Sequence, residues 1–219
     1  MYSKIVKPIL DIVIAFGVCI VMTPIFLIIA FLIKIDDGGA VFYRAKRLGQ
    51  NGRPFNMYKF RSMQENAPDI RNEDGTTYSA ADDPRLTKIG KKLREYSIDE
   101  LPQFYNVLKG EMSILGPRPD PLEWYEINTG EMNRKYSVKP GISGYTQAYY
   151  RNTLPLKEKN KSDLYYADNV SFMLDIKIFF KTLTTVFNHD NLYRNSDVVE
   201  FSGAESEVDY AEYSKGDSE

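Results

Sequence analysis

The stretch IVIAFGVCIVMTPIFLIIAFLI, Ile12–Ile33, contains no charged side chain, and it decides the fold class of the whole chain. As an α-helix, which rises about 1.5 Å per residue, these 22 residues would extend for about 33 Å, the thickness of a bilayer core. The run is too long for a cleaved signal peptide, and no clear small-residue cleavage site follows it. The sequence therefore predicts a membrane segment.

The centre and the flanks of this segment favour a bent path through the membrane. Pro24 removes one backbone hydrogen bond in mid-helix and should kink the helix at Thr23-Pro24. A spanning helix usually has an excess of basic residues on one side only, but here both flanks are basic: Lys4, Lys7, Lys34, Arg44, Lys46 and Arg47. A re-entrant helix with both ends on the cytoplasmic face is favoured, with a kinked spanning helix as the alternative, and Lys7 could pair with Asp11 one turn later.

Composition restricts the chemistry of the site. The chain has 219 residues, enough for one globular domain and an accessory segment, with a single cysteine, Cys19, and a single histidine, His189. These numbers exclude an intramolecular disulfide, a cysteine metal cluster and a multi-histidine metal site. The net charge is −2, but the last 16 residues alone carry −5, so the rest carries +3. This distribution suits anionic lipids or phosphates, and nucleic acid is not expected because long basic runs are lacking.

The chain divides into three regions by composition. We expect a re-entrant membrane helix over residues 1–36, a cytosolic domain with interfacial amphipathic helices over 37–203, and a disordered acidic tail over 204–219. The clearest amphipathic helix is predicted at Val170–Phe187, with an apolar stripe of Phe172, Ile176, Phe179, Phe180, Leu183 and Phe187. Core packing is the favoured interpretation of this stripe, and burial in the membrane interface is the alternative.

An acid pair opens the segment SIDELPQFYNVLKGEMSILGPRP, Ser97–Pro119. Apolar residues at helical spacing follow Asp99 and Glu100, and Pro102 is tolerated only in a first turn, so we expect a helix that starts near Asp99. Free backbone N–H groups and the helix dipole favour ionised acids there, and an ionised aspartate can act as a nucleophile or metal ligand. Ser97 and Glu100 also fit a capping box, and the spacing alone favours this purely structural interpretation.

Several basic side chains are candidates for phosphate contacts. Lys59 and Arg61 lie two residues apart at the end of a strand predicted over Phe55–Phe60, so they should share a face and either clamp a phosphate or cover a solvated surface. Arg94 precedes the acid pair on a basic helix, and two prolines restrain Arg118. A rigidly held arginine suits bidentate phosphate contact, with a plain proline-rich turn as the alternative.

Six features of the sequence together resemble the bacterial sugar transferase family, the small monotopic phosphoglycosyl transferases. They are the KPILD entry (Lys7–Asp11), the Thr23-Pro24 break, YKFRSM (Tyr58–Met63), DPRLTKIGKKLR (Asp83–Arg94), the Ser97–Pro119 segment and KPGISGYTQA (Lys139–Ala148). The resemblance extends from about residue 4 to about residue 187. It implies an α/β, mostly helical monotopic membrane protein. An N-terminal re-entrant helix-break-helix would carry a small cytosolic catalytic domain on the cytoplasmic face of the bacterial inner membrane.

The resemblance also implies a reaction. The family transfers a sugar 1-phosphate from a UDP-sugar to undecaprenyl phosphate with Mg²⁺ and releases UMP, the first membrane step of capsule, O-antigen, exopolysaccharide or glycoprotein glycan assembly. By the motif match, Asp99 would attack the β-phosphorus and carry a covalent phospho-sugar, and Glu100 would either help to hold Mg²⁺ or steer the second phosphate. Asp99 and Glu100 are the candidate metal ligands. The substrate-binding candidates are Lys59, Arg61, Arg94, Arg118 and Arg151.

Two other functions remain open from the residues alone. One is a non-catalytic membrane-bound scaffold in which the acid pair only caps a helix, and the other is a Mg²⁺-dependent lipid phosphohydrolase. The sequence does not select the sugar or the glycan pathway. The aromatic stripe of the last predicted helix permits a homodimer.

Overall fold

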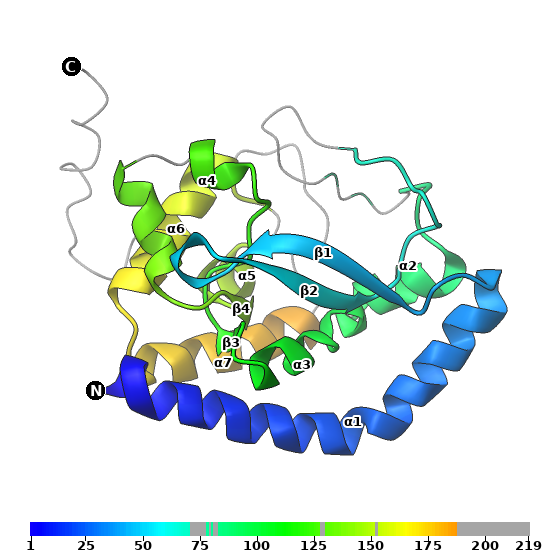
Figure 1. Cartoon of the computed structure of the whole chain (residues 1–219), viewed down its shortest axis with the longest axis horizontal. Helices are drawn as coiled ribbons and strands as arrows, with labels where there is room; N and C mark the ends of the chain where they lie inside the picture. Colours follow the sequence, from blue (N-terminus) through cyan, green and yellow to red (C-terminus); the bar gives the residue numbers. More distant parts are fainter. Residues whose placement is uncertain (71–77, 79, 81–82, 128–129, 152, 188–219) are drawn as a thin grey trace.

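The computed structural model describes residues 1–70, 78, 80, 83–127, 130–151 and 153–187. It is a long bent helix with a small, mostly helical domain packed along it (Figure 1). The predicted acidic tail and His189 lie outside the described residues.

Helix α1 (Lys7–Asp37) follows a short π-helical turn, η1 (Tyr2–Val6), and includes the whole apolar run. Pro24 lies inside it, and Figure 1 shows a bend midway along the helix. The structure corrects the expected break to a bend within one continuous helix, because a proline removes only one donor and the neighbouring turns keep their bonds. Among the described residues, Tyr2–Asp37 is the helical stretch long and apolar enough to cross a membrane, and most of its apolar window is exposed.

The N-terminal part of α1 is fastened to the domain by charged and polar groups. Lys7 Nζ lies 2.9 Å from Asp175, and 3.8 Å from Asp11, as expected from the sequence. Asp11 in turn accepts a 2.6 Å hydrogen bond from Ser113 Oγ. These groups are buried, so their mutual pairing compensates for part of their lost hydration.

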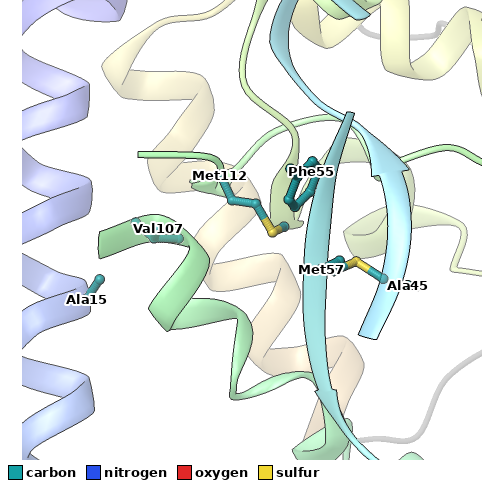
Figure 2. Packing of buried hydrophobic residues seen from close by; sticks show 6 residues of the cluster. All are labelled: Ala15, Ala45, Phe55, Met57, Val107 and Met112. Carbon is teal, nitrogen blue, oxygen red and sulfur yellow. The ribbon is translucent and has the colours of Figure 1, made fainter. Parts of the chain in front are cut away.

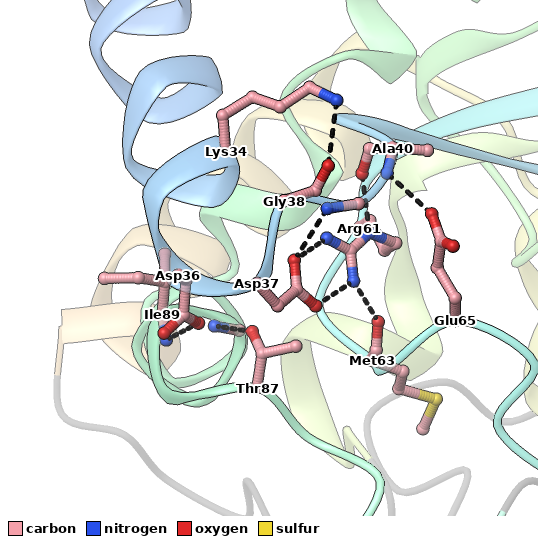
Figure 3. Close-up of polar contacts among 12 residues, drawn as sticks. Lys34, Asp36, Asp37, Gly38, Ala40, Arg61, Met63, Glu65, Thr87 and Ile89 are labelled. Carbon is pink, nitrogen blue, oxygen red and sulfur yellow. Dashed lines mark hydrogen bonds and ion pairs between the residues drawn. The ribbon is translucent and has the colours of Figure 1, made fainter.

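The C-terminal end of α1 is fastened to the same domain (Figure 3). The Asp37 carboxylate accepts two hydrogen bonds from the Arg61 guanidinium, and Asp36 Oδ2 accepts a 3.0 Å bond from the Ile89 N–H. The helix ends at Gly38, whose φ of 74° lies in the left-handed region that glycine tolerates. Both ends of the apolar helix are therefore bonded to the same domain.

The domain begins with an antiparallel hairpin of β1 (Phe42–Leu48) and β2 (Pro54–Phe60), joined through the short helical turn η2 (Gln50–Gly52). The inner face of this hairpin packs on α3, and α3 in turn packs on α1. The buried side chains of this core cluster are Ala15, Ala45, Phe55, Met57, Val107 and Met112 (Figure 2). On the outer face Arg44 and Lys46 are exposed in the middle of β1, whereas Leu48 and Phe60 at the ends of the strands are buried.

The rest of the domain is mainly helical, which confirms the α/β, mostly helical fold class. A parallel pair of three-residue strands, β3 (Ser113–Leu115) and β4 (Gly141–Ser143), lies among short helices. The remaining elements are α2 (Lys88–Glu95), η3 (Ile98–Glu100), α3 (Gln103–Leu108), α4 (Trp124–Ile127), η4 (Gly130–Ser137), α5 (Tyr145–Tyr149), α6 (Leu156–Asp168) and α7 (Phe172–Phe187).

Helix α7 contradicts the favoured core interpretation of its aromatic stripe. Ile178 is buried against α5 and α6, but Phe172, Phe179, Phe180 and Leu183 are exposed. The helix buries only a narrow strip through Asp175, Ile178 and Thr185, spaced for a single helix face. The wider apolar face of α7 is exposed, as is the apolar surface of α1. This exposure favours the membrane-interface alternative for α7.

Candidate active site

The acid pair lies in η3, a single 3₁₀ turn between α2 and α3. Ser97 reverses the chain with a left-handed φ of 55°, and α3 begins only at Gln103, with Pro102 as its cap. The expected helix start near Asp99 is therefore wrong. Pro102 would lack a donor inside a longer helix, and the chain instead completes one turn and then starts a second helix. The Ser97 side chain makes no capping bond, so the capping box does not form.

Glu100 is an ion-paired carboxylate. Its Oε1 lies 2.7 Å from Lys59 Nζ and 3.4 Å from Arg118 Nη2. Burial alone would raise the pKa of Glu100, but the cations Lys59 and Arg118 outweigh it and lower the pKa to about 2. Glu100 is therefore ionised at physiological pH and joins β2 to the loop that follows β3.

Asp99 has a different environment from its neighbour. Its side chain is 6% exposed, and in the part of the chain that the structure describes no hydrogen bond or ion pair reaches its carboxylate. Burial, together with the charge of Glu100, raises the pKa of Asp99 to about 6, against the opposing effect of the nearby Lys59 cation. Asp99 is thus mainly ionised at pH 7 with its oxygen lone pairs available, as a nucleophile requires.

Two further arginines reach the acid pair from other elements. Arg94 on α2 donates through Nε to Ser62 Oγ at 3.2 Å, and its charge lowers the pKa of Asp99. Arg151 donates through Nη2 to Ser97 Oγ at 3.3 Å, next to η3. Four of the five predicted substrate-binding residues, Lys59, Arg94, Arg118 and Arg151, are therefore gathered around Asp99 and Glu100.

Arg61 is the predicted site residue that the fold places elsewhere. Its guanidinium binds Asp37, the Ala40 carbonyl at 2.5 Å and the Met63 carbonyl at 2.9 Å (Figure 3). The expectation that Lys59 and Arg61 form one clamp is wrong, because β2 ends at Phe60 and the alternation of faces ends with it. Arg61 instead fastens the end of α1 to the hairpin.

Two glycines allow the close backbone contacts that position the cationic side chains, a role that the sequence motifs did not indicate. A Cβ on Gly90 would lie 1.9 Å from the Ser62 carbonyl oxygen, so glycine lets α2 lie directly on the strand end that Arg94 contacts. A Cβ on Gly144 would lie 1.9 Å from the Gly116 carbonyl oxygen, in the loop that carries Arg118. The available signal was glycine inside an otherwise helical pattern and in the KPGISG motif.

The site geometry predicts an acid limb in the pH dependence of any reaction that uses Asp99 as a nucleophile. Because the pKa of Asp99 is raised to about 6, the ionised form is present above that pH and is lost as the pH falls through it. Lys59→Met removes the cation that most lowers this pKa, so the limb should move to higher pH. The expected result is a larger loss of turnover at pH 6 than at pH 8, measured as a pH–rate profile.

Lys46→Met is the matched control, because Lys46 is exposed on the outer face of the same hairpin. Its profile should keep the wild-type midpoint. A Lys59→Met profile that is lowered equally at every pH would contradict the coupling of Lys59 to Asp99.

The acid pair also offers oxygen ligands to a metal ion. Within the described residues no group of three or more histidine, cysteine, aspartate or glutamate side chains could hold a metal ion. Mg²⁺ often binds to one or two carboxylates and completes its coordination with substrate phosphates and water. The oxygen donors of Asp99 and Glu100 fit this pattern when a phosphorylated substrate supplies the other ligands.

Adjacent carboxylates surrounded by cations, on a domain fastened to a long apolar helix, define a class: a membrane-associated enzyme that acts on phosphorylated substrates. Comparison with known families gives the particular family. The chain belongs to the bacterial sugar transferase family, which matches residues 2–189.

Three curated relatives show the range of this family. The exopolysaccharide production protein ExoY of Sinorhizobium fredii is 39% identical over 190 residues, covering 80% of this chain and 83% of the relative. The UDP-glucose:undecaprenyl-phosphate glucose-1-phosphate transferase of Klebsiella pneumoniae is 38% identical over 200 residues, covering 87% of this chain and 42% of the relative. The UDP-N-acetylgalactosamine-undecaprenyl-phosphate N-acetylgalactosaminephosphotransferase of Aeromonas hydrophila is 39% identical over 170 residues, covering 75% of this chain and 39% of the relative. This chain spans less than half the length of the last two relatives.

Proposed function

We propose that this protein transfers a sugar 1-phosphate from a UDP-sugar to undecaprenyl phosphate and releases UMP. The product, undecaprenyl-diphosphate-sugar, would start the assembly of an exopolysaccharide or capsule. The names of the Klebsiella and Aeromonas relatives support the reaction class. The observation that carries the proposal is the Asp99 carboxylate, which no described residue pairs with, beside the ion-paired Glu100.

The proposed reaction has two displacements at one phosphorus atom. An Asp99 carboxylate oxygen attacks the β-phosphorus, the bond from this phosphorus to the bridging oxygen breaks, and UMP leaves with the electron pair. A phosphate oxygen of undecaprenyl phosphate then attacks the same phosphorus, and the bond to Asp99 breaks, which restores the carboxylate. The acceptor is already an anion, so no histidine base is needed.

The surrounding residues supply charge and position in this proposal. Lys59 and Arg118 hold Glu100 ionised, and Arg94 and Arg151 add positive charge where the phosphates bind. Bound Mg²⁺, held by Asp99, Glu100 and the diphosphate, would neutralise phosphate charge.

We also propose that α1 is re-entrant and that the domain lies on the cytoplasmic face of the bacterial inner membrane. In support, both ends of α1 bind the same domain, through Lys7 and Asp175 at one end and Arg61 and Asp37 at the other. A spanning helix would place these ends about 30 Å apart on opposite sides of a bilayer. The bend and the exposed apolar face of α7 fit a helix that enters one leaflet and returns.

Cysteine labelling tests this topology. In a Cys19→Ser background, Ser3→Cys and Lys46→Cys place single thiols before and after the apolar helix. Both thiols should react with a membrane-impermeant maleimide in inverted membrane vesicles and stay unlabelled in intact cells. The Cys19→Ser protein without an added thiol measures background labelling, and labelling of the two thiols from opposite sides would show a spanning helix.

The reaction is tested with full-length protein in detergent or nanodiscs, a panel of UDP-sugars and undecaprenyl phosphate. We expect UMP release that depends on one or a few donors, together with a lipid-linked sugar diphosphate. A phosphohydrolase would release free phosphate from lipid pyrophosphates without any donor. A scaffold would release neither product, and either outcome would overturn the proposal.

A further inference from the structure

The inner face of the β1–β2 hairpin carries a cation at each end. In its register Tyr43 is opposite Lys59, Ala45 is opposite Met57, and Arg47 is opposite Phe55. These pairs share one face because side chains alternate along a strand. Lys59 binds Glu100 at one end, and Arg47 lies at the other end, four residues or about 13 Å along the strand from the Lys59 pair.

Arg47 differs from Arg61 and Arg85, the arginines that are buried among the described residues, because no described residue supplies it with an acceptor. Its Nε is buried and makes no hydrogen bond, and in the described ranges its guanidinium has no ion pair within bonding distance. Arg61 and Arg85 are both bound by aspartate carboxylates. A buried donor without an acceptor is unfavourable and rare, so the Nε–H of Arg47 is available to an acceptor from outside the described part of the chain.

Arg118 provides the second half of an anion site. The Leu48 N–H donates to the Asp120 carbonyl at 2.8 Å, which joins the end of β1 to the loop that carries Arg118. Burial lowers the pKa of Arg47, and the charge of the nearby Arg118 lowers it further, whereas the charges of Tyr43, Asp120 and Glu123 raise it. Asp120, one of the acids whose charge acts on Arg47, is already paired with Lys135 and lies 3.6 Å from Lys159 Nζ. An anion between the two guanidinium groups would relieve their repulsion.

We propose that Arg47 and Arg118 bind the α-phosphate of the nucleotide, the phosphate that leaves with UMP. This assignment rests on the proposed function, which places the β-phosphate at Asp99. Arg118 touches Glu100 and is near Arg47, so the cations continue from the acid pair toward the nucleotide. The α-phosphate gains negative charge as its bond to the β-phosphorus breaks, and fixed guanidinium groups stabilise that charge.

The test compares Arg47→Gln and Arg47→Lys with Arg44→Gln in the full-length protein. Arg44 lies on the same strand, but on the outer face, exposed over the Tyr58 ring. Calorimetry should show that Arg47→Gln weakens UMP binding by about tenfold to a hundredfold, that Arg47→Lys weakens it less, and that Arg44→Gln changes it less than about twofold. Binding of uridine, which has no phosphate, should not change in any variant.

Wild-type UMP affinity in Arg47→Gln would overturn the assignment. Equal weakening of uridine and UMP binding would also overturn it, because it would indicate a general distortion. The proposed function fails in a different way: a wild-type protein that binds UMP through Arg47 but releases none from any UDP-sugar would keep the anion site and exclude the transfer reaction.

Discussion

Asp99→Asn is expected to reduce UMP release at least about a hundredfold, because it removes the group that forms the bond to phosphorus while keeping its shape and size. The side chain is buried and has no ion pair among the described residues, so neutralising it breaks no salt bridge. Folding should therefore be kept while turnover is lost. The measurement is UMP release from the preferred donor, with a melting curve for each variant.

The same variant tests the covalent intermediate. Wild-type protein incubated with donor alone should show a sugar-phosphate adduct on the peptide that contains Asp99, and Asp99→Asn should show none by mass spectrometry. Asp168→Asn is the control, because Asp168 is a surface aspartate paired with Arg134 and should keep wild-type turnover. Activity above about a tenth of wild type in Asp99→Asn would exclude Asp99 as the nucleophile.

Gly144→Ala is expected to have the second largest effect, on stability and on donor binding together. The added Cβ would lie 1.9 Å from the carbonyl oxygen and 2.9 Å from the carbonyl carbon of Gly116, so backbone must move to admit it. The Gly116 N–H also donates to Ser143 at 2.9 Å, which fixes the two segments against each other. Arg118 follows two residues after Gly116, so the same shift would move it away from Glu100.

Overpacking of this kind should cost about 3 kcal/mol in the free energy of unfolding, which corresponds to a fall of about 6–12 °C in melting temperature for a chain of this size. The donor KM should rise in the protein that remains folded. Gly17→Ala is the control, because a Cβ on Gly17 meets no atom within 4 Å. A Gly144→Ala protein that melts within about 2 °C of wild type and keeps its KM would show that the loop tolerates the methyl group.

Whether the sequence predicted the position of a site residue correctly depends on how far away in the chain its partner lies. Lys59 was identified as a cation near a phosphate site, and the structure places it 2.7 Å from Glu100. Strand periodicity predicted the same role for Arg61, but Arg61 binds Asp37, which lies 24 positions away in the chain. Strand periodicity predicts the face on which a side chain lies only as far as the strand extends. It does not predict which residues pack against that face.

The capping box illustrates the same limit at shorter range. Ser97 and Glu100 have the right spacing, but Glu100 is drawn to Lys59 and Arg118. A charge-assisted bond to a cation is stronger than a cap to a neutral N–H, so tertiary contacts override the local motif. Arg47 was noticed only as a basic flank of the membrane segment, because an unpartnered buried donor can be recognised only once the surroundings are known.

The sequence alone determined the long apolar segment and its bend, the hairpin, the family and the acid pair, because each depends on local composition, local spacing or a contiguous motif. Only the tertiary structure decided which of the two carboxylates is ion-paired by described residues, which cations surround the pair, and which face of α7 is exposed. Ion pairing and burial depend on groups that are distant in the chain, and it is the packing of α1, the hairpin and the glycine-lined loops that brings those groups together.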